Sequence, residues 1–135
     1  MFSKKTRYAI LAVTALAREY GKGPIPISRL AEEEGIPRRF LESILLQLKN
    51  IGLLKSTRGK DGGYFLAKAP SEISIRTIIE ECESAEFMPC INGKLHPTCS
   101  FDRDMDKCSL RAILINVYSS AANILDEATF ADLVK

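Results

Sequence analysis

A mainly α-helical fold with one small β-hairpin is predicted by three features of this 135-residue sequence. Large aliphatic residues recur at helical spacing between residues 36 and 51, which predicts an amphipathic helix. Two short segments with a glycine-rich loop between them follow at once, which predicts a hairpin. Beyond residue 109, apolar residues again recur at helical spacing for about four turns, which predicts a long C-terminal helix.

The helix between residues 36 and 51 is predicted from an apolar stripe at positions i, i+3, i+4 and i+7, namely Leu41, Ile44, Leu45 and Leu48. Pro37 suits its first turn, where the missing N–H has no intrahelical partner, and Gly52 ends it. The face opposite the stripe can hydrogen-bond base edges or phosphates in a DNA major groove. Its polar residues are Arg39, Glu42, Ser43, Gln47 and Asn50, with Arg38 and Lys49 nearer the edge. Leu46 lies outside the stripe, and the pattern gives it no role.

The hairpin is predicted to pair residues 53–57 with residues 63–67 around a loop at 58–62. Three glycines among residues 59–63 allow the positive φ values that a tight loop needs. Arg58 and Lys60 place positive charge at the tip, where it could reach an adjacent minor groove or the DNA backbone. A solvated amphipathic helix beside an ordinary hairpin would show the same two patterns, so the preceding segment decides between these interpretations.

Two further helices are predicted before this pair of elements. An alanine-rich helix covers about residues 3–20, and its small side chains permit close approach of another helix. A short helix follows a turn at residues 21–24 and stops at Gly35. This short helix, the turn and the next helix form a helix-turn-helix pair. With the hairpin they form a winged helix-turn-helix domain over residues 1–69.

Residues 70–135 are predicted to contain a helix, a cysteine-bearing sensor loop and the long C-terminal helix. The first helix follows a Ser74 N-cap, and Cys82 on its apolar side is interpreted as a small buried hydrophobe. The loop covers residues 84–107, and loops of that length are usually functional or disordered. The long helix could pack on its own domain, but its stripe is too large to remain in solvent and we expect a dimerisation helix. A last short helix is expected after Thr129.

Charge is divided unevenly along the chain. Residues 1–68 hold 13 Lys and Arg against 6 Asp and Glu, a net of +7, whereas residues 69–135 hold 6 against 11, a net of −5. The basic half suits a polyanionic partner, although a solvated basic face would give the same count.

The composition excludes several other classes of protein. No apolar run approaches the roughly 20 residues of a membrane span. The basic and then apolar N-terminus imitates a secretory signal, but its removal would delete the first helix, so we expect a cytoplasmic protein. There is one histidine, no nucleophile–base pair at a recognisable spacing and no phosphate-binding loop, which argues against an enzyme.

Three cysteines, Cys90, Cys99 and Cys108, are separated by eight residues each and lie on or beside the long loop. Thiolates on one segment can fold around a soft metal centre such as an iron–sulfur cluster, zinc or copper. The spacing is wider than the close pairs of structural zinc sites. His96 lies between the first two cysteines and could complete the ligand set. Loop thiols with no role would invite oxidation, so we expect a metal site or a redox function.

Several short motifs of the chain occur together in one known family. They are Ser3 to Ala9, Ile36-Pro37 with Phe40-Leu41-Glu42, Leu48 to Leu54, the wing Arg58-Gly59-x-x-Gly62-Gly63-Tyr64, and the cysteine series before the terminal helix. On these residues the chain resembles the Rrf-type bacterial transcription regulators, the group that contains IscR, NsrR, RirA and CymR. The resemblance covers essentially the whole chain, and the wing is its most specific part.

This resemblance implies a homodimer in which long helices cross and two winged domains bind a palindromic operator in double-stranded DNA. In that family the helix that starts near Arg38 reads the major groove, and the wing arginine, Arg58 here, enters the minor groove. Relatives with three such cysteines hold an iron–sulfur cluster, for which 2Fe–2S is expected here in preference to 4Fe–4S. The expected function is a transcription regulator, such as a repressor, that senses redox, iron–sulfur or nitric-oxide status.

The cysteine spacing is wider than in the best-known relatives, and two positions depart from the family pattern. Some relatives take a fourth cluster ligand as His three residues after the third cysteine, where this chain has Arg111, and others take a carboxylate from the partner's first helix, where it has Arg7. Neither arginine can ligate iron, so His96, Cys82, a carboxylate among residues 102–106 or an exogenous ligand would serve. Cluster-free members also exist. The alternatives are therefore a regulator with a thiol or zinc switch, and a winged-helix module for protein–protein interaction.

Overall fold

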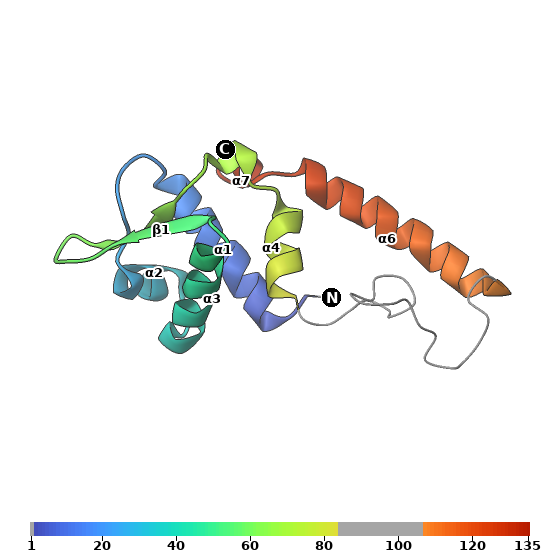
Figure 1. Cartoon of the computed structure of the whole chain (residues 1–135), viewed down its shortest axis with the longest axis horizontal. Coiled ribbons are helices and arrows are strands. Elements are labelled where there is room, and N and C mark those ends of the chain that lie inside the picture. Colours follow the sequence, from blue (N-terminus) through green and yellow to red (C-terminus); the bar gives the residue numbers. More distant parts are fainter. Residues whose placement is uncertain (1, 84–106) are drawn as a thin grey trace.

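The computed structural model describes residues 2–83 and 107–135. The N-terminal body contains α1 (Lys4–Arg18), α2 (Ile27–Glu34), α3 (Arg38–Asn50) and an antiparallel hairpin of β1 (Leu54–Thr57) and β2 (Gly63–Leu66) (Figure 1). It is followed by the one-turn 3-10 helix η1 (Pro70–Glu72), then α4 (Ile75–Cys82), α6 (Ser109–Glu127) and α7 (Phe130–Leu133). The predicted mainly helical fold with one small hairpin is confirmed.

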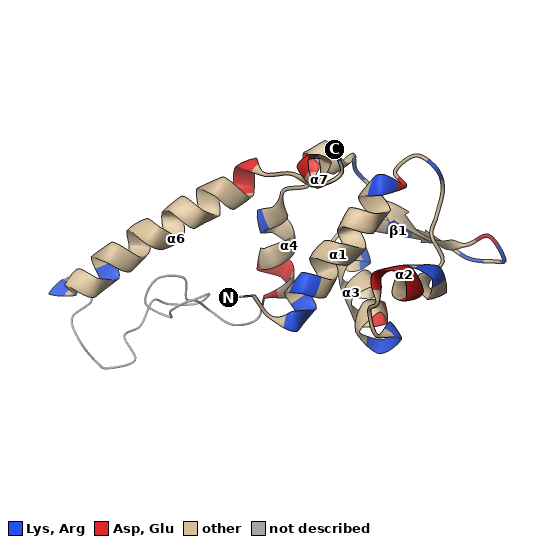
Figure 2. Ribbon diagram, turned by 180° about the vertical axis from the view of Figure 1, so that it is seen from behind, with Lys and Arg blue, Asp and Glu red and all other residues tan. Residues whose placement is uncertain are grey.

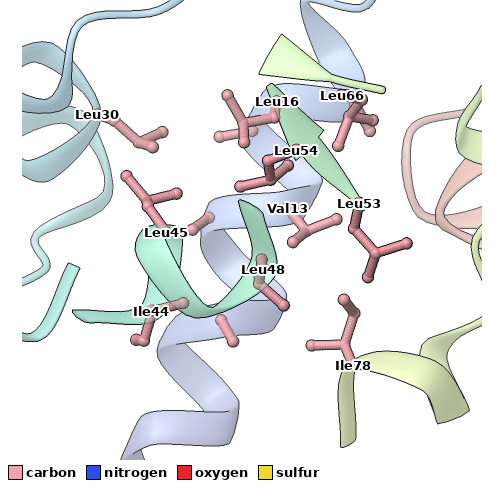
Figure 3. Packing of buried hydrophobic residues seen from close by; sticks show 14 of the residues in the cluster. Val13, Leu16, Leu30, Ile44, Leu45, Leu48, Leu53, Leu54, Leu66 and Ile78 are labelled. Carbon is pink, nitrogen blue, oxygen red and sulfur yellow. The ribbon is translucent and has the colours of Figure 1, made fainter. Parts of the chain in front are cut away.

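Helix α3 packs its predicted stripe against α1. All four stripe residues are fully buried, and Figure 3 shows Ile44, Leu45 and Leu48 beside Val13 and Leu16 of α1. The small residues of α1 allow this close approach. The helix begins one residue later than the proline pattern predicted, because the residue before Arg38 has an extended backbone (ψ 129°) and serves as the N-cap.

The turn between α2 and α3 depends on one glycine. Gly35 has a φ of +63°, a left-handed conformation that glycine adopts without steric cost. The chain then reverses, and the Ile36 N–H donates to the Ala31 carbonyl at 3.0 Å, with Ile36 itself buried. This turn sets the direction of α3 relative to α2.

The hairpin is anchored to the body by a short bridge. In register, Leu54 pairs with Leu66 and Thr57 pairs with Gly63. The N–H groups of Ile25 and Tyr64 each donate to the other residue's carbonyl at 2.9 Å, which ties β2 to the segment before α2. A Cβ on Gly63 would overlap the Ile25 carbonyl, so only glycine fits this crossing.

The apolar core continues past residue 69, where the predicted domain boundary lies. Ile73, Ile78, Cys82 and Phe130 belong to the same cluster as the stripe of α3 and the inner face of α1. Phe130 is fully buried, and its N–H donates to the Ile73 carbonyl at 3.1 Å. Cys82 is 3% exposed, as expected of a small hydrophobe, and burial raises the pKa of its thiol. The division into units 1–69 and 70–135 stays a prediction.

Helix α6 extends away from the body beyond α4 (Figure 1). It has no fully buried residue, although one side of it contacts α4. Its most exposed large side chains are Leu110, Ile113, Val117 and Ile124. Within residues 2–83 and 107–135, no helix is long and apolar enough to span a bilayer.

Candidate nucleic-acid interface

The outward face of α3 is polar and solvent-exposed because the buried stripe fixes the rotation of the helix. Its exposed polar residues are Arg38, Arg39, Glu42, Ser43, Lys49 and Asn50. Nε of Arg38 donates to Oε1 of Glu42 at 3.1 Å, with the two side chains 61% and 55% exposed. An exposed pair of this kind contributes only about 0.3–0.5 kcal/mol, so both groups can exchange it for contacts to another molecule.

Gln47 was predicted on this face, but its half-buried side chain forms hydrogen bonds to other parts of the same chain. Lys5 Nζ donates to Gln47 Oε1 at 2.7 Å, and Gln47 Nε2 donates to the backbone carbonyl of Glu81. The half-buried amide therefore joins α3 to the start of α1 and the end of α4. Sequence periodicity could not find this role, because Lys5 and Glu81 are distant in sequence.

A second set of contacts at this junction was also missed by the sequence analysis. The Ser3 N–H and the Thr6 hydroxyl donate to Oε2 of Glu83 at 2.9 and 2.8 Å. Glu83 lies directly after α4, so its carboxylate holds the first turn of α1 against the end of α4. Thr6 is fully buried and has its hydrogen bond satisfied by this carboxylate.

The hairpin tip presents two cations to solvent. The Gly62 N–H donates to the Gly59 carbonyl at 3.1 Å, which closes the loop, and Gly59 has a φ of +107°. Arg58 and Lys60 are exposed on this loop, and neither forms an ion pair within the described residues. Figure 2 shows Lys and Arg at the hairpin tip, on α3 and on the first turns of α1. Lys and Arg therefore occur on all three of these elements.

Of the three predicted cysteine ligands and His96, only Cys108 lies within the described residues; Cys90, His96 and Cys99 lie outside them. Cys82, named as an alternative fourth ligand, is buried in the apolar core and is 3% exposed. Cys108 is half-buried and is the N-cap of α6, where its Sγ accepts the Arg111 N–H at 3.4 Å. In the part of the chain described here, no three His, Cys, Asp or Glu side chains are grouped as a metal site.

Comparisons with known proteins match nearly the whole chain. The family model described as "Rrf2: Iron-dependent Transcriptional regulator" matches residues 2–135. A protein of Rhodobacter capsulatus, named as an rrf2-like HTH-type transcriptional regulator, is 32% identical over 138 residues, covering 99% of this chain and 92% of that protein. The HTH-type transcriptional regulator IscR of Serratia proteamaculans is 30% identical over 132 residues, covering 98% of this chain and 77% of that protein.

The fold also matches a solved structure. CymR, the global cysteine regulator of B. subtilis, superposes with a TM-score of 0.79 at 29% identity, covering 99% of this chain and 95% of that chain. The predicted winged helix-turn-helix fold is therefore confirmed.

Proposed function

The chain belongs to the Rrf2 family of transcriptional regulators, as its motifs predicted, and on this premise we propose that it binds a palindromic operator as a homodimer. Its relatives are transcription regulators and not enzymes. The observation that carries the proposal is the exposed polar face of α3 beside a basic wing. A helix and a charged loop of this kind are complementary to a groove and its phosphates.

In the proposed complex, α3 enters the major groove and the wing lies at the adjacent minor groove. Arg38, Arg39, Glu42 and Ser43 would contact base edges and phosphates, because they are exposed at the start and middle of α3. Arg58 and Lys60 would follow the backbone or enter the minor groove from the tip of the hairpin. We leave Gln47 out of the contact set because its amide already binds Lys5 and Glu81.

The proposed dimer is supported by the outer side of α6. Leu110, Ile113, Val117 and Ile124 recur at intervals of three, four and seven residues, the period of a coiled-coil seam, and are 55–68% exposed. Burying them against a second copy would contribute roughly 4–7 kcal/mol per helix. An apolar side that runs along most of a projecting helix suits self-association.

The proposed sensor is an iron–sulfur cluster, with 2Fe–2S preferred, held by Cys90, Cys99 and Cys108 with His96 as a further candidate. Thiolates are the soft ligands that iron–sulfur clusters usually take, and imidazole also ligates iron. A bound cluster would supply a redox-active centre that oxidants or nitric oxide can alter. Cys108 is also the N-cap of α6. The same residue would therefore bind the cluster and begin the proposed dimerisation helix.

A cluster-free regulator with a thiol or zinc switch is the second candidate. It is supported by the similarity to CymR, a global cysteine regulator. Metal content separates the two candidates, since both require DNA binding and the same cysteines.

DNA binding is tested by selecting duplexes from a random library with the purified protein. We expect an inverted repeat to be enriched, and Arg58→Ala to weaken binding to it by about 1–3 kcal/mol. Arg76→Ala is the matched control, because this arginine lies on α4 and pairs with Glu80 at 2.7 Å, away from the wing. Failure to enrich any duplex would favour a protein-interaction module instead.

The cluster is tested by anaerobic purification with absorbance, iron, sulfide and zinc analysis. We expect brown protein that loses its colour in Cys90→Ala, Cys99→Ala and Cys108→Ala. Cys82→Ala is the matched control and should keep the colour, because this thiol is buried in the core. Colourless, iron-free protein after reconstitution would exclude the cluster, and bound zinc would support the second candidate.

A further inference from the structure

Leu46 lies on the outward face of α3 and is 54% exposed. It follows Arg39 and Ser43 and precedes Asn50 at positions i, i+4, i+7 and i+11, so these four residues form a row along one side of the helix. The row is opposite the fully buried stripe that packs on α1. Leu46 therefore takes no part in the core, and its neighbours along the row are polar.

The next residue along the chain is excluded from this row. Gln47 lies toward α1 and α4, where Lys5 and the Glu81 carbonyl hold its amide. Leu46 lies between Ser43 and Asn50 on the face that would meet the bases. The row rises about 16 Å along the helix axis, at about 1.5 Å per residue, and Leu46 is its third member.

The chemistry of the major groove then identifies what a leucine at this place can contact. The base edges there present hydrogen-bond donors and acceptors, and the one apolar group among them is the C5-methyl of thymine. Leucine offers no hydrogen bond, but it can bury that methyl between the polar contacts of Arg39, Ser43 and Asn50. We propose that Leu46 is a specificity-determining residue that selects thymine through its C5-methyl. This inference rests on the proposed insertion of α3 into the major groove.

The test uses a duplex selected by the wild-type protein and the same duplex made with deoxyuridine in place of thymidine, which lacks only the methyl groups. The dissociation constant of each duplex is measured for the wild type, Leu46→Ala and Leu11→Ala. Leu11 is the matched control because it is a 43% exposed leucine on α1, outside α3. Far-UV circular dichroism and thermal unfolding confirm that each variant is folded.

We expect the wild type to bind the deoxyuridine duplex about fourfold more weakly for each contacted thymine, the ratio that corresponds to burial of one methyl. Leu11→Ala should show the same loss, whereas Leu46→Ala should bind both duplexes equally. Selection with Leu46→Ala should also lose the preference for thymine at one position in each half-site.

Two results would overturn the inference while DNA binding itself stands. The wild type could bind both duplexes equally, or Leu46→Ala could lose as much affinity as the wild type when the methyls are removed. A selected operator without thymine in the half-site would overturn it as well. If no duplex is bound at low salt, the proposed function fails, and this inference fails with it.

Discussion

Replacing Ile113 and Ile124 of α6 by alanine should separate the proposed dimer without unfolding the chain. The two side chains are 60% and 68% exposed, so the core of a single chain does not depend on them. Alanine also has the highest helix propensity, so α6 itself should remain helical. The double variant therefore removes intermolecular contacts and leaves the rest of the structure in place.

The expected magnitude follows from the exposed fraction of each side chain. Each substitution removes three carbon atoms, and burial of a methylene contributes about 0.8 kcal/mol, so each loses about 1.5 kcal/mol when scaled by exposure. Both chains of a dimer carry both substitutions. The free energy of dimerisation should therefore become less favourable by about 6 kcal/mol, which raises the dissociation constant roughly 10⁴-fold.

Sedimentation over a range of protein concentrations measures this change, and circular dichroism checks that the helices remain. Leu133→Ala is the control, because this leucine of α7 is 43% exposed but lies outside the seam of α6. Equal dimer dissociation constants for the double variant and the wild type would refute the reasoning. So would a wild-type chain that is monomeric at every concentration.

Three further predictions concern stability. Gly63→Ala should lower the free energy of unfolding by about 1–3 kcal/mol, because its Cβ would overlap the Ile25 carbonyl and break the bridge to the wing. Urea unfolding measures this change. An unchanged unfolding midpoint would contradict the close approach of Gly63 to Ile25. Phe130→Ala should cost about 3–5 kcal/mol in the same assay, because the ring is fully buried; a surface-like loss under about 1 kcal/mol would show that α7 does not join the core. Burial raises the pKa of the Cys82 thiol in the folded protein above its ordinary value of 9.0. The buried neutral thiol therefore stabilises the fold fully below pH 9.0, and this stabilisation is lost as pH rises through the higher folded pKa. Urea unfolding of the wild type and of Cys82→Ala across this alkaline range should show a smaller loss in the variant, and parallel losses would contradict the assignment.

The elements of the fold were predictable where a local pattern reports a buried face. The stripe Leu41, Ile44, Leu45 and Leu48 repeats with the period of a helix, and all four side chains are fully buried. The boundary was one residue early because the φ of proline is compatible with both the N-cap and the first turn, and the extended ψ of Pro37 decides between them.

Contacts between distant segments left no local signal. Gln47 has the pattern of a solvent-facing residue, yet its partners come from α1 and α4. Glu83 bonds to Ser3 and Thr6 across 80 and 77 residues of sequence. Phe130 could be placed on a short helix, but its burial against the segment after η1 depends on the folded path of the chain.

In the candidate site, too, the local pattern predicted some features and left others untested. The exposure of Arg38, Arg39, Glu42 and Ser43 on α3 followed from the helical period, and that of Arg58 and Lys60 followed from the glycine-rich loop. Their contacts with DNA stay a prediction. The metal-ligand set also stays a prediction, because its members other than Cys108 lie outside the described residues.

The salt dependence of the affinity for the selected duplex is the most direct test of DNA binding through α3 and the wing. Lys and Arg that contact phosphates release counterions, so the logarithm of the association constant should fall linearly with the logarithm of salt concentration. Lys60→Ala, which removes a cation at the wing tip, should make that slope shallower by about 1, and Arg76→Ala should leave it unchanged. An affinity that does not respond to salt, or equal slopes for the wild type and Lys60→Ala, would contradict DNA binding through this surface.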